Sequence, residues 1–326
     1  MVVALEVIPD RFEHARVRST GKQWIRVLYG RPWRALRHES NVTAAPASFG
    51  GRVPRGSQGS VPSTTIWQSM PSSYRGKVRS FGATDVGCVR EVNEDAYLRD
   101  DLLQLYVVAD GMGGHAAGEV ASREAVDTVH GMIKRGLAAM GRKLTGGITE
   151  ASAKAACRLM EAAVQAATYM VFAMAELDTG KSGMGTTISA LLVLNDYAVI
   201  GQVGDSRVYQ LRQGQAVQLT EDHTLVAWQV KQGLITPEQA KRSPFRNIIT
   251  RAVGDRDYVQ VDTGLIELIP GDRLLLCSDG LHGYLRPLEI PVLCAGDGSA
   301  VVDTLIRVAN GRGGKDNITA VLVEVL

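Results

Sequence analysis

The sequence predicts an α+β fold in which two packed antiparallel β-sheets are flanked by helices, an α/β/β/α sandwich. Two observations lead to this fold class. From Arg79 onward the chain has many short apolar runs separated by turn residues, and a few long segments carry apolar residues at helical spacing. Sheets that are apolar on one face bury it against each other, and helices cover the outer faces. The apolar fraction of 45% suits a core of this size.

The predicted strands are short runs with the composition and spacing of β-structure. They span residues 79–84, 95–98, 105–109, 186–194, 197–203, 208–211, 264–269, 273–278 and 317–325. The run at 105–109 is rich in valine and continuously apolar, which indicates a strand that is buried on both faces. Asn195-Asp196 joins two of the runs and is a strong hairpin signal.

The predicted helices span residues 116–140, 150–177 and 300–309. In the first, apolar residues recur at helical spacing and charged residues occupy the other face. Thr149-Glu150 marks the start of the second. A further polar stretch, residues 222–242, has Thr236-Pro237-Glu238 as a helix start and lies between two strand regions. We therefore expect an inserted flap at about residues 219–255.

The first 79 residues differ in kind from the rest of the chain. They carry 13 Lys and Arg against 4 Asp and Glu, a balance of +9, which leaves 23 and 30, or −7, for residues 80–326. Residues 44–73 are dominated by Ser, Pro, Gly, Thr and Ala and offer little to bury, although residues 2–8 and 24–29 could be partly ordered. We interpret residues 1–79 as a basic, disordered N-terminal arm and residues 80–326 as the folded domain.

Several roles for the arm stay open. Its arginines could bind nucleic acid or an acidic membrane surface, and an arginine-rich, acid-poor N-terminus also resembles a transit peptide. A solvated tail, or an upstream extension of the reading frame, is the interpretation that we favour. We therefore expect no nucleic-acid partner, except one that the basic arm would bind.

The cysteine spacing and the hydropathy indicate the cellular compartment and the kinds of site to expect. Cys88, Cys157, Cys277 and Cys294 are widely spaced without a C-x-x-C pair, so neither a disulfide framework nor a zinc ribbon is indicated. Reduced thiols are typical of a cytoplasmic protein, which is the location that we expect. No uncharged apolar stretch reaches the 18 or so residues that a membrane span requires.

Carboxylates recur beside apolar runs in widely separated parts of the chain. Asp110 follows the 105–109 run, Asp279 and Asp316 lie beside later runs, and Glu94-Asp95 precedes them all. Hard divalent cations such as Mg²⁺ and Mn²⁺ prefer oxygen ligands, and a pair of ions needs several converging carboxylates. Each stretch taken alone could be an ordinary glycine-rich or aspartate-rich turn. Together they predict a site for divalent cations.

An ordered set of motifs identifies a family. The chain has REVNED at 90–95, VADGMGGH at 108–115, GTT at 185–187, GDSR at 204–207, ITRAVG at 249–254, SDG at 278–280 and DN at 316–317. With these motifs, residues 80–326 resemble the metal-dependent PPM family, the protein phosphatase type 2C group of serine/threonine phosphatases, in its bacterial form. One such motif is weak evidence, whereas the complete set in the family's order is strong.

The resemblance implies two Mn²⁺ or Mg²⁺ ions bridged by Asp110. The backbone carbonyl of Gly111 would serve one ion, and Asp279 and Asp316 the other. Such ions lie roughly 3.5–4 Å apart and lower the pKa of a shared water, which gives a hydroxide for in-line attack on phosphorus. Glu94 and Asp95, which precede these ligands in the chain, would bind directly or through metal-bound water.

Two further roles carried over from the family concern the substrate. Arg90 is suited to grip phosphate oxygens with two hydrogen bonds, although a lone arginine in a loop is by default a solvated charge. His115 would serve as general acid for the leaving group, or would stabilise the turn or the ligand shell. Many relatives place a histidine directly after Asp-Gly, where this chain has Met112.

The chain also differs from the family in the ligands available for a third metal ion. Bacterial relatives often bind one with the aspartate of Gly-Asp-Ser-Arg, here Asp205, the central aspartate and a carboxylate four residues later. The chain has Gly283 at that last position. Asp205 would then bind a weak third ion, with His282 or water compensating, or would simply hold its turn.

The function implied is hydrolysis of phosphoserine and phosphothreonine in proteins, in opposition to a cognate Ser/Thr kinase, by a monomer. A second possibility within catalysis is the related group that dephosphorylates regulators of sigma-factor circuits. An alternative of another class is a non-catalytic PPM-fold module that binds a regulatory partner. Loss of Asp110 or Asp279 would have indicated such a module, and both are present.

Overall fold

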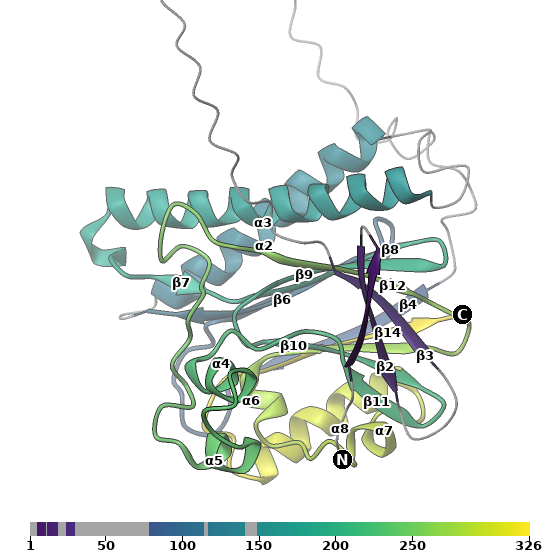
Figure 1. Ribbon diagram of the computed structural model, residues 1–326. Coiled ribbons are helices and arrows are strands. Elements are labelled where there is room, and N and C mark those ends of the chain that lie inside the picture. The colour runs from purple at the N-terminus through teal and green to yellow at the C-terminus, as the bar shows by residue number, and fades with distance from the viewer. Residues whose placement is uncertain (1–4, 11, 19–23, 30–77, 114–116, 141–148) are drawn as a thin grey trace, which may run out of the picture.

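The computed structural model describes residues 5–10, 12–18, 24–29, 78–113, 117–140 and 149–326, and the side chains of 78–113, 117–140 and 149–326. Two antiparallel sheets lie face to face between two layers of helices (Figure 1). The predicted sandwich is therefore confirmed. None of the described helices is long and apolar enough to cross a membrane.

The larger sheet has nine strands among the described residues. Its order is β1 (Leu5–Asp10), β2 (Phe12–Arg18), β3 (Trp24–Tyr29), β12 (Asp262–Glu267), β9 (Tyr197–Val203), β8 (Ile188–Leu194), β6 (Leu105–Met112) and β5 (Asp95–Asp100), with the short β7 (Gly185–Thr186) paired to β6. Strands β1–β3 belong to the segment predicted as an arm, and β3 pairs with β12. Most of that segment, including residues 44–73, lies outside the described residues.

In the part of the chain that the structure describes, the smaller sheet has five strands. Its order is β11 (Gln215–Gln218), β10 (Arg207–Arg212), β13 (Arg273–Cys277), β14 (Ile318–Val325) and β4 (Val78–Asp85). The pairing of β14 with β4 joins parts of the chain that are far apart in sequence.

Helices cover the outer face of each sheet. Two long helices, α2 (Ala117–Met140) and α3 (Glu150–Leu177), lie over the larger sheet, and α8 (Gly298–Gly311) lies over the smaller one (Figure 1). The short elements are η3 (Thr179–Lys181), α4 (Leu225–Lys231), α5 (Pro237–Arg242), α6 (Asp279–His282) and α7 (Ile290–Leu293).

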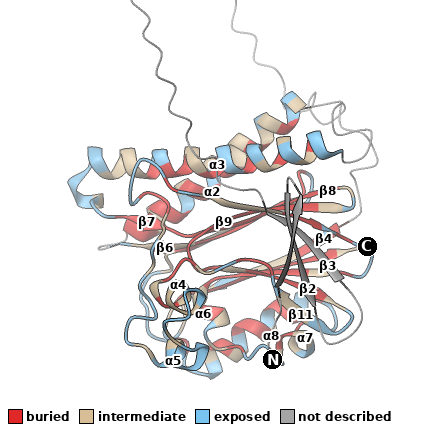
Figure 2. Ribbon diagram, viewed as in Figure 1, coloured by how far each residue is buried: buried red, intermediate tan, exposed pale blue. Residues whose placement is uncertain are grey.

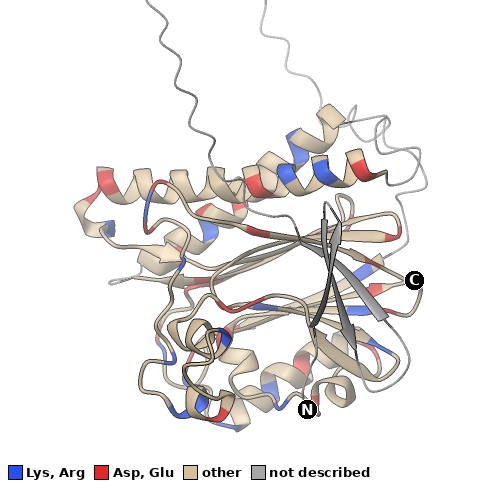
Figure 3. Ribbon diagram, viewed as in Figure 1, with Lys and Arg blue, Asp and Glu red and all other residues tan. Residues whose placement is uncertain are grey.

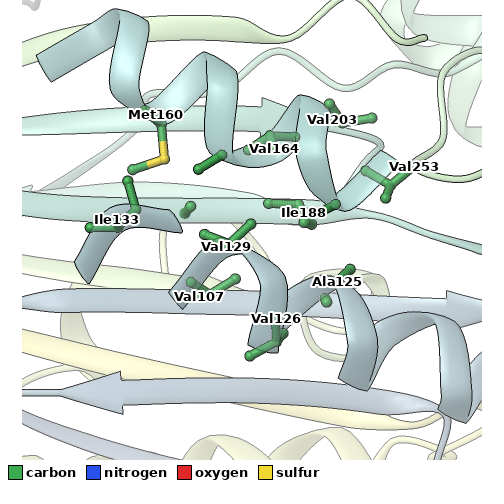
Figure 4. Packing of buried hydrophobic residues seen from close by; sticks show 14 of the residues in the cluster. Val107, Ala125, Val126, Val129, Ile133, Met160, Val164, Ile188, Val203 and Val253 are labelled. Atoms are coloured by element: carbon green, nitrogen blue, oxygen red, sulfur yellow. The ribbon is translucent and has the colours of Figure 1, made fainter. Parts of the chain in front are cut away.

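Strand β6 shows how the layers are built. Leu105, Val107 and Ala109 face α2 and α3, whereas Tyr106 and Val108 face the smaller sheet. All five are fully buried, as the continuously apolar run predicted. The cluster under the helices includes Ile133 and Met160 (Figure 4), and burying one such side chain contributes about 1.5–3 kcal/mol. Figure 2 shows that burial is concentrated in the strands and the sheet-facing sides of the helices.

Local signals fixed several boundaries correctly. Thr149 caps α3 and Thr236 caps α5, each in a reciprocal capping box, and Pro237 occupies the first turn of α5. Asn195 adopts a φ of 56° in the predicted hairpin turn between β8 and β9. Strand β6 differs from the prediction, because it runs past Asp110 to Met112 instead of turning at once; the pairing of Gly111 with Thr186 of β7 extends it.

Candidate metal and phosphate site

The backbone of Asp110 is fixed by its neighbours at the end of β6. Its N–H donates to Oγ1 of Thr187 (2.9 Å), and its carbonyl accepts from Oγ1 of Thr186 (2.9 Å) and from N–H of Thr187 (2.9 Å). Thr187 Oγ1 also contacts Oγ of Ser206 (2.7 Å) in the turn after β9. The GTT and GDSR motifs therefore hold the strand end that carries the aspartate.

Asp110 continues the row of β6 residues that faces the smaller sheet, and Asp95 is its partner in the ladder with β5. Asp95 is buried, and its Oδ2 accepts from Oγ of Ser278 (2.8 Å) and Oγ1 of Thr319 (2.6 Å). Its Oδ1 is buried without a hydrogen-bond partner among the described residues. Burial, followed by the charges of Asp279 and Asp316, raises the pKa of Asp95 to about 7.

The smaller sheet supplies the other two carboxylates. Asp279 begins α6, two residues after the last residue of β13, and Asp316 lies two residues before the start of β14. The carboxyl groups of Asp279 and Asp110 lie within hydrogen-bonding reach of each other, and burial and the charge of Asp316 raise the pKa of Asp279. Aspartates at the ends of both sheets therefore converge on one point between the sheets.

The electrostatics of the cluster fit bound cations. Burial raises the pKa of Asp110 well above its ordinary value, and the charges of Asp95, Asp279, Asp205 and Asp316 raise it further. Within residues 78–113, 117–140 and 149–326, no three His, Cys, Asp or Glu residues form a complete cage for a metal ion. The aspartates and the unpaired Oδ1 of Asp95 are thus a partial set of oxygen ligands, of the kind that Mg²⁺ completes with water.

Glu94 and Gly111 meet the start of α2. Gly111 N–H donates to the carbonyl of Glu94 (3.1 Å). A Cβ on Gly118 would lie 2.5 Å from Oε1 of Glu94, so this carboxylate packs against the first turn of the helix, where negative charge is favourable. A Cβ on Gly111 would lie 2.2 Å from the carbonyl oxygen of Gly118. Only glycine fits at either position, which explains part of the glycine-rich motif.

Arg90 lies at the exposed edge of the cluster. Its Nη2 donates to Oδ2 of Asp316 (2.9 Å), and both side chains are partly open to solvent. This hydrogen bond is the main reason that the pKa of Arg90 is raised, and Glu94 and Asp110 add smaller contributions. The guanidinium is thus held beside the carboxylates with donors to spare for a ligand anion.

Asn317 fastens the loop that carries Arg90. Its Oδ1 accepts from N–H of Glu94 (2.8 Å), and its Nδ2 donates to the carbonyls of Val86 and Val92 (3.0 Å each). Sequence reasoning placed Asn317 in a motif but gave it no role. The buried position of an amide directly after Asp316 is the signal that only the structure supplies.

Asp205 lies in the turn after β9. Gly204 has a φ of 96° in that turn, which favours glycine. Burial and the charge of Asp279 raise the pKa of Asp205 to about 7. Nε2 of His282 contacts the backbone carbonyl of Asp205 (3.0 Å), and burial lowers the pKa of His282 to about 3. The neutral ring therefore supports the turn through this nitrogen.

A second histidine, His223, ties the flap to the same turn. Its Nδ1 accepts from N–H of Gly204 (3.1 Å), and its Nε2 contacts Oδ2 of Asp262 (3.1 Å). Its own backbone bonds to Gly204 and to Thr250 at the other end of the flap. Beside it, Arg207 forms two hydrogen bonds with Asp222. Sequence reasoning missed His223.

His115, the predicted general acid, lies outside the described residues. The structure brings together Arg90, Asp95, Asp110, Asp279 and Asp316, with Glu94, Gly111 and Asp205 next to them. Their roles in metal and phosphate binding remain predictions.

Comparison with known proteins places this arrangement in a family. Residues 89–325 match the family model described as Protein phosphatase 2C. The serine/threonine phosphatase stp of Listeria innocua is 37% identical over 246 residues, which are 74% of this chain and 93% of that protein. The crystal structure of the Mycobacterium tuberculosis serine/threonine phosphatase PstP/Ppp is 35% identical, has a TM-score of 0.66, and is matched over 76% of this chain and 98% of that one. A crystal structure of the catalytic domain of the serine threonine protein phosphatase PstP in complex with 2 manganese ions is 33% identical, with a TM-score of 0.65 and the same two coverages.

Proposed function

The chain belongs to the protein phosphatase 2C family, and from that premise we propose which of its residues carry the reaction. It is a metal-dependent protein serine/threonine phosphatase that uses two Mn²⁺ or Mg²⁺ ions and acts on phosphoproteins. This agrees with the function expected from the motifs. The assignment of individual side chains is our proposal.

Asp110, Asp279 and Asp316 hold the two ions, with the carbonyl of Gly111 and the carboxylates of Glu94 and Asp95 beside them. The convergence of three aspartates from both sheets supports this assignment. So do the raised pKa values, because cations would relieve the repulsion that raises them. The unpaired Oδ1 of Asp95 supplies an oxygen for an ion or its water.

Bound divalent ions supply a water of lowered pKa and neutralise charge on the phosphate. Arg90 binds and orients the phosphate oxygens from the exposed edge, and Asp316 holds the guanidinium ready. Asp95, held by Ser278 and Thr319, keeps its carboxylate fixed beside Asp110. His115 donates the proton to the leaving serine or threonine oxygen.

The convergence of Asp110 and Asp279 carries the proposal, and Asp279→Asn tests it. Asparagine keeps the shape and removes the charge, so Mn²⁺-dependent release of phosphate from a phosphothreonine peptide should fall by at least about 100-fold. Asp303→Asn, at an exposed position on α8, is the matched control and should retain activity. Full activity of Asp279→Asn would overturn the assignment, and Mn²⁺ binding without turnover by the unaltered protein would favour a non-catalytic module instead.

Finer points are also proposals. The phosphatase domain is residues 80–326 with a flap at about 219–255, and a weak third ion binds near Asp205, for which its burial and raised pKa are the support. The protein is a cytoplasmic monomer that opposes a Ser/Thr kinase. Light scattering, cell fractionation and comparison of phosphoproteins after removal of the protein test these statements.

A further inference from the structure

The flap exposes an unusual surface. Trp228, Phe245 and Ile248 have 51%, 55% and 45% of their surface open to solvent, although side chains of this size are normally covered. Lys241, Arg242 and Arg246 are exposed beside them in the sequence. These six residues, which we call the flap surface, lie on α4, α5 and the turn after α5. Figure 3 shows Lys and Arg gathered at the outer end of this segment.

The flap surface is one connected unit. Phe245 N–H donates to Oγ of Ser243 (3.2 Å), and Ile248 N–H donates to the carbonyl of Phe245 (3.1 Å), so the chain turns tightly after α5. Leu225 N–H in the first turn of α4 donates to the carbonyl of Ile248 (2.9 Å). The turn after α5 is thereby fastened to the helix that carries Trp228.

Among the described side chains, the ion pairs of the flap and its surroundings include none of the three cations of the flap surface, and Glu238 on the same helix pairs with none of them. Other flap cations are paired: Lys231 with Glu221 (2.7 Å) and Arg251 with Asp262 (2.7 Å). Since residues 80–326 carry a balance of −7, a group of three free cations stands out. Its charge and its exposed aromatic rings are complementary to an acidic segment that also carries apolar side chains.

Both ends of the flap are anchored at the candidate site. Val253 exchanges two backbone hydrogen bonds with Thr186 (3.0 and 2.8 Å), whose hydroxyl holds the carbonyl of Asp110. His223 bonds to Gly204, next to Asp205. A polypeptide with its phosphate at the aspartate cluster would therefore have its flanking residues near an element that starts and ends there.

We propose that the flap surface binds an acidic segment flanking the phosphorylated residue, so that this phosphatase prefers phosphoproteins whose phosphorylation sites lie in acidic, partly apolar sequences. This inference rests on the proposed function of the aspartate cluster and adds the substrate class. Attraction between exposed charges in water is screened by salt, so the preference weakens as ionic strength rises.

The test uses the full chain with Mn²⁺ and three substrates. These are an aryl phosphate, a phosphothreonine peptide flanked by glutamates and leucine, and the same peptide with glutamine for glutamate. The variant is Lys241→Glu/Arg242→Glu/Arg246→Glu. The control is Arg135→Glu/Arg158→Glu/Arg307→Glu, which makes the same charge change at exposed positions on α2, α3 and α8.

At low salt, the unaltered protein and the control should hydrolyse the glutamate peptide with a kcat/KM at least about fivefold above that of the glutamine peptide. The flap variant should lose or reverse this preference and keep its aryl phosphatase activity. Equal kcat/KM for both peptides, or an unchanged preference in the flap variant, would overturn the inference while leaving the proposed function intact. If the unaltered protein does not hydrolyse the aryl phosphate, both the inference and the proposed function are overturned. If the flap surface binds a single-stranded oligonucleotide in a salt-sensitive way and the protein shows no peptide preference, the surface binds nucleic acid instead.

Discussion

Asp95 on β5 and Asp110 on β6 are direct partners in an antiparallel ladder, and their side chains lie on the same face of the sheet. Two carboxylates in such positions repel each other and would ordinarily weaken the strand pair. Here the pair lies at the edge of a cluster completed by Asp279 and Asp316 from the other sheet. The fold thus keeps an unfavourable arrangement where cations can compensate for it.

The conservative change Arg90→Lys should reduce phosphatase activity. Lysine keeps the positive charge but cannot offer two parallel N–H donors to a phosphate or reach Asp316 in the same geometry. We expect kcat/KM for a phosphothreonine peptide to fall by roughly 10–100-fold, mainly through KM, and inhibition by inorganic phosphate to weaken with it. Steady-state kinetics with Arg256→Lys, an exposed arginine in another loop, provide the control. Wild-type kinetics in Arg90→Lys would mean that Arg90 is only a solvated charge.

Metal-free protein should lose stability as pH rises, and Asp205→Asn should reduce the loss. The pKa of Asp205 is raised to about 7 in the folded protein from an ordinary value of 3.8. The folded state therefore holds a proton that the unfolded state releases, so the favourable contribution is complete below about pH 4 and disappears as pH passes 7.

Asparagine at position 205 does not ionise. In the presence of a chelator, Asp205→Asn should be more stable than the unaltered protein at pH 8, by on the order of 2–4 kcal/mol, and about equal to it at pH 4. Urea unfolding at the two pH values measures this difference. A constant difference between the variants at both pH values would contradict the account.

Substitutions of His223 can separate the contacts of its two ring nitrogens. Its Nδ1 accepts from N–H of Gly204, and its Nε2 lies 3.1 Å from both Oδ2 of Asp262 and Nη1 of Arg251. Asparagine can mimic the Nδ1 acceptor and glutamine can reach towards Asp262, whereas alanine does neither. We expect His223→Ala to cost about 2–4 kcal/mol of stability and to expose the flap to limited proteolysis, with each isostere recovering part of the loss.

The same three variants show which ring nitrogen of His223 positions the flap. If His223 places the flap relative to the Asp205 turn, His223→Asn should protect the flap from protease better than His223→Gln, because it keeps the bond to Gly204. Equal protease sensitivity of all three variants and the unaltered protein would show that His223 is not what holds the flap.

Gly280→Ala should disrupt the site. A Cβ at this position would lie 1.9 Å from the backbone carbonyl oxygen of Asn317, so α6 and the loop after Asp316 must move apart. We expect loss of at least about 2 kcal/mol of stability and of most activity. Gly311→Ala, where a Cβ meets open space in α8, is the matched control and should stabilise the protein by up to about 1 kcal/mol. Thermal unfolding and phosphate release check both.

Much of the fold follows from local chemistry. The valine-rich run of β6, the Thr149 and Thr236 caps and the Asn195 turn depend on neighbours within a few residues, and sequence reasoning placed all of them. The course of β6 beyond Asp110 could not be predicted from local sequence, because its extension depends on pairing with β7, which lies far along the chain. The glycines there allow close approach of α2 instead of a sharp turn.

The residues of the candidate site also differ in whether the sequence alone predicts their roles. The aspartates could be proposed from the sequence because cations require oxygen ligands and the motifs occur in a known order. Asn317 and His223 could not be given roles, because each acts through buried hydrogen bonds to segments distant in the chain. Such residues resemble ordinary polar residues until the packing is known.

Asp316 lies two residues before β14, and this has a consequence for the order in which the site is assembled. Strand β14 lies between β13 and β4, so the smaller sheet stays split until the last residues of the domain have been synthesised. Until β14 has paired with both neighbours, Asp316 is not held beside Asp95, Asp110 and Asp279, so assembly of the aspartate cluster is coupled to the closing step of domain folding.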